Sequence, residues 1–294
     1  MDARSQDSSS LERESVVIEG GPRPLHGVLH LPFGRDPAPL VVVAHGFKGF
    51  MDWGFFPPLA DLLAARGFAA LRFNFSGAGM EPGDERVTDL EAFRRNTLSR
   101  EVEELLTVIE EGPGLAPERI PADPVGVLGH SRGGGVAILA AARDRARDRI
   151  GALVTWNAIG SVERWSRDEA ERWRDEGVHW IENSRTGQRL PLGVELLEDV
   201  EENREKLDIA AAARERVVPW LLVHAEEDES VSVDEARELA AEARSPVELE
   251  IIEGTGHTFG AGHPFRGPTP ALIRAMNRAQ GWFRQWLRAG SAVE

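Results

Sequence analysis

Short apolar runs and longer amphipathic stretches alternate along most of this chain. Runs rich in Val, Leu, Ile and Ala, bounded by Gly, Pro or polar residues, predict strands at 14–20, 25–32, 40–45, 69–75, 124–129, 152–157, 219–225 and 247–253. Stretches with apolar residues three to four positions apart predict helices at 54–66, 88–111, 131–143, 234–244 and 269–288. The first three strands have no helix between them and should form a meander. The later alternation indicates a mostly parallel sheet with helices on both faces.

Residues 160–215 interrupt this alternation, because they are too long for a single crossover between two strands. They contain two helical patterns, at 161–176 and 193–206, which we interpret as an inserted helical segment. We therefore expect an α/β core formed by residues 13–159 and 216–290, an insertion at 160–215, and a disordered N-terminal stretch at 1–12.

The most informative motif is Gly129-His130-Ser131-Arg132-Gly133. It follows an apolar run and precedes an alanine-rich segment, and Gly-x-Ser-x-Gly in a strand–turn–helix setting is typical of the nucleophile elbow of a serine hydrolase. The two glycines remove Cβ atoms that would clash in so tight a turn. The helix that follows directs its free N–H groups toward the serine. A glycine-rich packing turn is the alternative, and the presence of catalytic partners decides against it.

Two later strands lead into the partners that such a serine needs. The strand at 219–225 is followed by Asp228, and the strand at 247–253 is followed by His257. The order Ser131, Asp228, His257 is the chain order of α/β-hydrolases and differs from that of chymotrypsin and subtilisin. We therefore predict these three residues as nucleophile, acid and base.

Other acids and histidines near these positions are alternatives to the chosen pair. Glu226 and Glu227 are expected to be solvated loop charges, although either could replace the predicted acid. His263 competes as the base but lies farther from the strand end, and we interpret it as structural. His130 and His224 are interpreted as packed, hydrogen-bonded histidines.

The loop His45-Gly46-Phe47-Lys48-Gly49 after the strand at 40–45 supplies a candidate oxyanion hole. A developing oxyanion needs two preorganised N–H donors. The amide of Arg132 directly follows the nucleophile, and the amide of Phe47 can approach it because Gly46 has no side chain. We predict these two amides as the donors.

Composition narrows the classes of partner and cofactor. The chain has 34 basic and 49 acidic residues and a net charge of −15, which disfavours nucleic acid as a partner. It has no cysteine, and its histidines lack metal-ligand spacing, so we expect no metal and no cofactor. Without a run of 18 apolar residues or a signal-like N-terminus, we expect no membrane partner and a cytoplasmic location.

Together these motifs make the chain resemble the α/β-hydrolase superfamily, in particular the bacterial carboxylesterase and dienelactone-hydrolase-like group with its cinnamoyl (feruloyl) esterases. The resemblance covers about residues 25 to 287. It is carried by His45-Gly46-Phe47-Lys48-Gly49, Arg72-Phe73-Asn74-Phe75-Ser76-Gly77, Gly129-His130-Ser131-Arg132-Gly133-Gly134, Glu226-Glu227-Asp228-Glu229-Ser230-Val231 and Gly256-His257-Thr258-Phe259. It implies an α/β-hydrolase fold with a mostly parallel eight-stranded sheet and a helical cap over the active site. Asn74 replaces an aspartate that is usual in the family, which leaves the triad intact.

We therefore expect a serine hydrolase that cleaves small to medium or aromatic carboxylic esters through an acyl-enzyme. Its expected partner is this small-molecule ester substrate. A peptidase, amidase, thioesterase or C–C bond hydrolase on the same triad is an alternative, as is a non-catalytic binding protein. Four tryptophans, Trp156, Trp165, Trp173 and Trp180, either anchor the insertion or line an acyl or aryl pocket. The oligomeric state stays open, with a homodimer among the alternatives.

Overall fold

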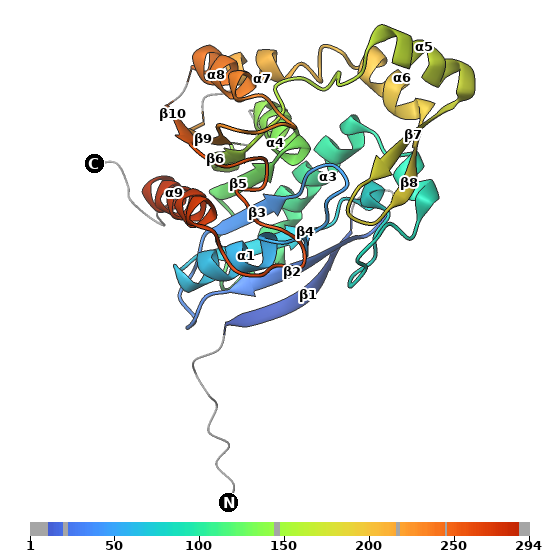
Figure 1. Ribbon diagram of the computed structural model, residues 1–294. Coiled ribbons are helices and arrows are strands. Elements are labelled where there is room, and N and C mark those ends of the chain that lie inside the picture. The colour runs from blue at the N-terminus through green and yellow to red at the C-terminus, as the bar shows by residue number, and fades with distance from the viewer. Residues whose placement is uncertain (1–10, 20–22, 144–147, 216–217, 245, 288–294) are drawn as a thin grey trace, which may run out of the picture.

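A central eight-stranded sheet with the strand order β1-β2-β4-β3-β5-β6-β9-β10 organises the molecule (Figure 1). The computed structural model describes residues 11–19, 23–143, 148–215, 218–244 and 246–287. The strands are β1 (Glu12–Ile18), β2 (Leu25–Leu31), β3 (Leu40–Ala44), β4 (Ala69–Phe73), β5 (Val125–His130), β6 (Ile150–Trp156), β9 (Trp220–Ala225) and β10 (Val247–Ile252). Among the described strand pairs of this sheet, β1–β2 and β2–β4 are antiparallel and the other five are parallel, so the predicted mostly parallel sheet is confirmed.

The first three strands do not form the predicted meander. β1 and β2 pair as a hairpin, but β2 then pairs with β4 and not with β3. The reason is helix α1 (Phe56–Ala65), which connects β3 to β4. A helical crossover returns the chain parallel to the strand it left, and β4 thereby occupies the place between β2 and β3.

Helices cover both faces of the sheet, as predicted. Helices α1 and α9 (Pro270–Trp286) pack on one face, and their apolar side chains join one hydrophobic cluster with Val41, Val154 and Leu221 of the strands. A second cluster on the opposite face contains apolar residues of α3 (Leu98–Glu111), α4 (Arg132–Arg143) and α8 (Val233–Glu242). Two short 3-10 helices, Ser76–Ala78 and Gly112–Leu115, lie in connections.

The single helix predicted at 88–111 consists of two helices. Helix α2 (Leu90–Arg94) ends before Asn96, and α3 begins after Thr97. Thr97 has an extended backbone and its side chain accepts a hydrogen bond from the Arg100 amide, so it acts as the N-cap of a new helix. The apolar periodicity continues across this break, so the sequence pattern did not predict it.

The segment between β6 and β9 contains a β-hairpin that the sequence pattern did not predict. Its elements are α5 (Arg167–Glu176), β7 (Val178–Asn183), β8 (Gln188–Gly193), α6 (Val194–Glu202) and α7 (Ile209–Glu215). Helices α5 and α6 correspond to the two predicted helical patterns. In Figure 1, α5, α6 and the β7–β8 hairpin project at one end of the molecule, whereas α7 lies beside α4.

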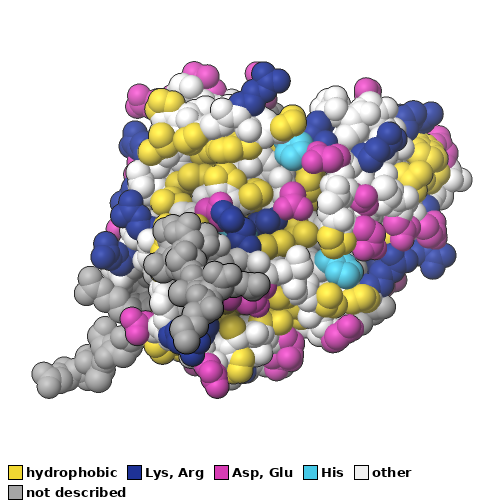
Figure 2. Space-filling model, turned by 90° about the horizontal axis from the view of Figure 1, so that it is seen from below, with side chains coloured by type: hydrophobic (Ala, Val, Ile, Leu, Met, Phe, Trp, Pro, Cys, Tyr) yellow, Lys and Arg dark blue, Asp and Glu magenta, His cyan; other side chains and the backbone are white. Residues whose placement is uncertain are grey.

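Part of the predicted N-terminal disordered stretch, residues 1–10, lies outside the described residues, as do residues 288–290 of the predicted core. Glu12 already belongs to β1. No helix in the described ranges is long and apolar enough to cross a bilayer. Figure 2 shows one face of the molecule, on which Lys and Arg side chains are dispersed among Asp and Glu.

Candidate active site

Ser131 occupies the sharp turn between β5 and α4. Its φ of 57° lies in the left-handed region, which is unfavourable for a residue with a side chain and is typical of strained functional positions. A Cβ on Gly129 would lie 2.3 Å from the Gly133 carbonyl oxygen, and one on Gly133 would lie 2.3 Å from the His45 carbonyl oxygen. Both glycines are therefore required for the turn, which has the geometry of a nucleophile elbow.

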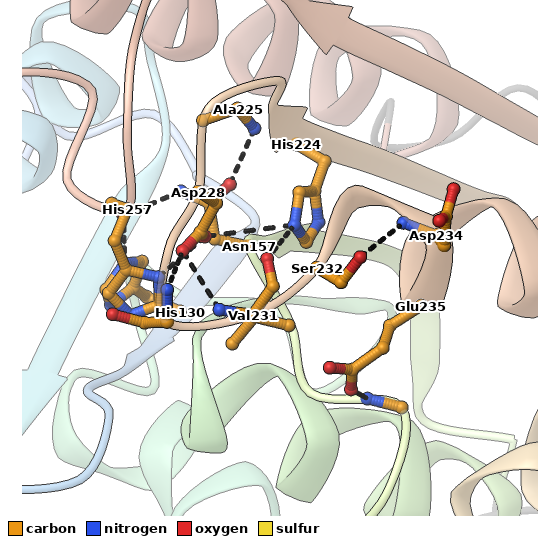
Figure 3. Close-up of polar contacts among 12 residues, drawn as sticks. His130, Asn157, His224, Ala225, Asp228, Val231, Ser232, Asp234, Glu235 and His257 are labelled. Atoms are coloured by element: carbon orange, nitrogen blue, oxygen red, sulfur yellow. Dashed lines mark hydrogen bonds and ion pairs between the residues drawn. The ribbon is translucent and has the colours of Figure 1, made fainter.

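Asp228 and His257 lie in the loops that follow β9 and β10, and they form a hydrogen-bonded pair (Figure 3). The His257 Nδ1 atom is 2.7 Å from Asp228 Oδ2. The other carboxylate oxygen, Oδ1, accepts hydrogen bonds from the amides of Ser230 (2.8 Å) and Val231 (2.9 Å). Because a carboxylate can only accept, Nδ1 carries the proton, and Nε2 of the neutral ring is free to accept one.

The environment of Asp228 keeps its carboxyl group ionised. Its side chain is fully buried, and burial alone would raise the pKa. The hydrogen bond and charge of His257, together with the amides of Val231 and Ser230, outweigh the burial, so the pKa of Asp228 is lowered. An ionised Asp228 is suited to orient and stabilise a protonated imidazole.

Ser131 and His257 both line one cavity of about 410 Å³ between the core and the segment that carries α5 and the β7–β8 hairpin. The Ser131 hydroxyl makes no direct hydrogen bond to His257 in this structure. Apolar and aromatic side chains make up most of the wall, from Phe47, Leu98, Ile159, Val162, Trp165, Trp173, Ile181, Leu192, Leu196 and Val231. The described residues hold no cluster of three His, Asp or Glu side chains that could bind a metal ion.

The backbone of the loop after β3 runs directly beside the nucleophile. A Cβ on Gly46 would lie 2.9 Å from the Cβ of Ser131, so only glycine permits this approach. Within the ranges that the structure describes, neither the Phe47 amide nor the Arg132 amide has a hydrogen-bond acceptor. The two amides predicted as oxyanion donors therefore follow the two residues in this contact, Gly46 and Ser131, and are unpaired among the described residues.

Two hydrogen bonds of the His45 side chain hold this loop in place. The Phe75 amide donates to His45 Nε2 at 3.2 Å, so Nδ1 carries the proton and donates to the Gly46 carbonyl at 2.9 Å. Burial lowers the pKa of His45 to about 4, which keeps the ring neutral and this tautomer fixed. The loop is thereby held in place before any ligand binds.

The side chains of Phe47 and Arg132, the two residues predicted to form the oxyanion hole, also contact each other. The Arg132 guanidinium lies 5.1 Å from the centre of the Phe47 ring, and its Nε donates to Glu101 at 2.8 Å. Arg132 and Glu101 are both buried. Sequence reasoning missed Glu101, because its only signal is an acidic residue at a position of α3 that faces the core.

The structure divides the four predicted pocket tryptophans into two pairs. Trp165 and Trp173 line the cavity. Trp156 is completely buried in the core on the face covered by α1 and α9, and Trp180 is 46% exposed. Neither Trp156 nor Trp180 lines the cavity. Trp156 packs against aromatic rings of the core, and Trp180 points away from the cavity.

The remaining acids and histidines lie where the sequence interpretation placed them. Glu226 and Glu227 are exposed. His263 accepts a hydrogen bond from the Gly54 amide and does not line the cavity. His130 and His224 are buried, and their Nε2 atoms lie 3.0 Å from the carbonyl oxygens of His257 and Val231, respectively.

Comparison with protein families gives an independent assignment. The model of the alpha/beta hydrolase family matches residues 41–267. A curated relative, 2,6-dihydropseudooxynicotine hydrolase of Paenarthrobacter nicotinovorans, is 28% identical over 171 residues. This alignment covers 57% of the present chain and 41% of that protein, so less than half of the relative's length is spanned.

Solved structures of the same fold cover nearly the whole chain. Est1E from Butyrivibrio proteoclasticus has a TM-score of 0.67 at 18% identity, over 92% of this chain and 98% of that chain. The structure of Est1E with ferulic acid bound gives 0.68 at 19%, over 92% and 99%. Dienelactone hydrolase from Anabaena variabilis gives 0.63 at 19%, over 95% and 99%. At such identities these similarities establish the fold alone.

Proposed function

Because the chain belongs to the alpha/beta hydrolase family, we propose that it is a hydrolase, and specifically a serine esterase that cleaves carboxylic esters through an acyl-enzyme. The observation that carries this proposal is the Asp228–His257 pair, joined at 2.7 Å, which opens onto the same cavity as the strained Ser131. A nucleophile, a base and an acid that orients the base are the parts that acyl transfer to serine requires.

In the proposed reaction the Ser131 hydroxyl attacks the ester carbonyl carbon and transfers its proton to His257 Nε2. The carbonyl oxygen becomes an oxyanion, which accepts hydrogen bonds from the amides of Phe47 and Arg132. Collapse of this intermediate breaks the bond to the alcohol oxygen, and the alcohol leaves with the proton held by His257. Water, deprotonated by His257, then releases the acid and restores Ser131, while Asp228 stabilises the imidazolium in both steps.

The cavity supports small to medium or aromatic acyl groups as substrates. A cavity of about 410 Å³ is within the usual size range for small-molecule sites, and its apolar wall includes Trp165 and Trp173. An aromatic ring gains both buried area and edge-to-face contacts with such side chains. The ferulic acid bound by the structurally similar Est1E is an aromatic acid of this size class.

The test is labelling with a fluorophosphonate probe, followed by peptide mapping and by assay of 4-nitrophenyl acetate. We expect wild-type protein to be labelled at Ser131. We expect Ser131→Ala to be unlabelled and to lose about three or more orders of magnitude in kcat, with an unchanged circular dichroism spectrum. Ser161→Ala, at an exposed serine, is the matched control. Near-normal turnover by folded Ser131→Ala protein would contradict the proposal.

A further inference from the structure

Asn157 directly follows β6 and lies at the centre of the hydrogen bonds around the acid–base pair (Figure 3). Its φ of 48° is in the left-handed region, and its side chain is completely buried. It does not line the catalytic cavity. A buried polar residue in an unfavourable backbone conformation, next to a candidate site but outside it, requires a physical reason.

Three hydrogen bonds account for the position of Asn157. Its backbone amide donates to the Val223 carbonyl at 3.0 Å. Its side-chain Oδ1 accepts from the Ala225 amide at 2.7 Å, and its Nδ2 donates to the His257 carbonyl at 2.7 Å. Ala225 is the last residue of β9, and Asp228 lies three residues beyond it. One side chain thus joins the strand that carries the acid to the loop that carries the base.

The chemistry of this position selects asparagine. The side chain must accept on one atom and donate on another, which an ionised aspartate cannot do, and it must tolerate a left-handed backbone. His130 supplies a second donor to the same His257 carbonyl, at 3.0 Å from its Nε2. Both acceptor sites of that carbonyl are therefore occupied, and the loop is tied to β5 and to the end of β6.

We propose that Asn157 is a positioning residue that fixes the His257 backbone relative to Asp228. This inference rests on the proposed function, in which His257 must reach Ser131 and Asp228 at once. The Asp228 hydrogen bond orients the imidazole ring, and the Glu227 amide, which donates to the Thr255 carbonyl at 3.0 Å, joins the two loops ahead of His257. Asn157 holds the backbone of His257 itself, and a displacement of about 1 Å between reacting groups can lower a rate about 100-fold.

Asn157→Gly is the primary test, because glycine adopts a φ of 48° without strain while losing both side-chain hydrogen bonds. We expect kcat for 4-nitrophenyl acetate to fall about 10- to 100-fold, with KM within about threefold of wild type. The matched control is Thr155→Ala, two residues earlier on β6, which removes a buried hydrogen bond from Trp220 Nε1 (2.9 Å). It should lower the free energy of unfolding and leave kcat within about threefold. Unchanged kcat in Asn157→Gly, or an equal loss in Thr155→Ala, would overturn the proposal.

Asn157→Asp supplies a readout that a purely structural role would not change, and it decides the question if the glycine variant does not fold. Its carboxyl group can donate to the His257 carbonyl only while it is protonated. His130, His224 and Asp228 also titrate beside His257, but they are present in both proteins, and for this reason the variant is compared with wild type at each pH. On protein shown to be folded at each pH, the ratio of variant to wild-type kcat should therefore decrease at least about tenfold as the pH rises and the carboxyl ionises. A ratio independent of pH would overturn the proposal.

A spectroscopic signal separates this inference from the proposed function. The proton on His257 Nδ1, shared with Asp228, is expected at low field in the proton NMR spectrum and is assigned by its absence in His257→Asn. We expect the signal to shift or disappear in Asn157→Gly and to persist in Thr155→Ala. If wild-type protein hydrolyses no ester and is not labelled at Ser131, the proposed function fails, yet an unchanged signal in Asn157→Gly would still overturn the role of Asn157.

Discussion

At the scale of single residues, the two oxygens of Asp228 have different partners. Oδ1 accepts from the amides of Ser230 and Val231, and only Oδ2 faces His257. In Asp228→Asn the side-chain oxygen must keep facing the two amides, so the NH₂ group turns toward His257. It then donates to Nδ1 and moves the imidazole proton to Nε2, where it blocks proton transfer from Ser131.

We therefore expect Asp228→Asn to lower kcat by about three to four orders of magnitude without changing the fold. The measurement is esterase turnover together with the rate of fluorophosphonate labelling. Glu227→Gln removes a neighbouring exposed acid and should leave both rates within about twofold. If Glu227→Gln loses as much activity as Asp228→Asn, the assignment of the catalytic acid is incorrect.

The sequence allowed Ser131, Asp228 and His257 to be selected because each follows a strand that its apolar pattern reveals. Asn157 also stands at the end of a predicted strand, but nothing in the sequence links it to its partner His257, which is 100 positions away. Whether their atoms meet depends on the register between β6 and β9 and on the path of a loop. Neither of these follows from the local pattern of hydrophobic residues, so residues that support the triad were missed.

At the scale of elements, the β7–β8 hairpin determines which side chains of the insertion face the cavity. His179 and Ile181 line it, whereas Trp180 between them points away, as the alternation of a strand requires. The sequence pattern predicted helices on both sides of this hairpin but not the hairpin itself. Its strands carry polar residues and a proline, which made the alternation inconspicuous. The sequence therefore could not show which tryptophans face the cavity.

Trp165, which lines the cavity, and Trp180, which does not, therefore provide a matched pair of variants. Trp165→Ala removes part of the cavity wall, and we expect it to raise KM for 4-nitrophenyl benzoate about tenfold while KM for the acetate changes less. Trp180→Ala removes a side chain that is 46% exposed and should leave both KM values within about twofold. Equal effects of the two substitutions would contradict the placement of the aryl-binding wall.

At the scale of the whole molecule, alternating strands and helices were sufficient to predict the parallel sheet and its two helical layers. The alternation was not sufficient to predict the order in which the strands pair. The place of β4 between β2 and β3 depends on which strand edges are free when α1 returns the chain to the sheet. The parallel arrangement brings the carboxyl ends of β3, β5, β9 and β10 to one edge, where the candidate site lies.

Buried histidines link this architecture to the stability of the whole protein. Burial lowers the pKa of His30 and His45 to about 4 and that of His130 to about 3. A histidine in the unfolded chain titrates near pH 6.5. Between these values the unfolded chain binds protons that the folded protein does not. The stabilisation is therefore fully present above about pH 6.5 and is lost as the pH falls toward 4.

Urea unfolding at a series of pH values measures this effect. We expect the free energy of unfolding to decrease below about pH 6.5, with a slope near pH 5 that corresponds to at least about three protons taken up on unfolding, one for each of these histidines. Net charge predicts the opposite sign, because acidification reduces the charge of −15 and with it the repulsion within the compact state. A constant or rising stability between about pH 6.5 and 5 would therefore show that His30, His45 and His130 are not held neutral by the fold.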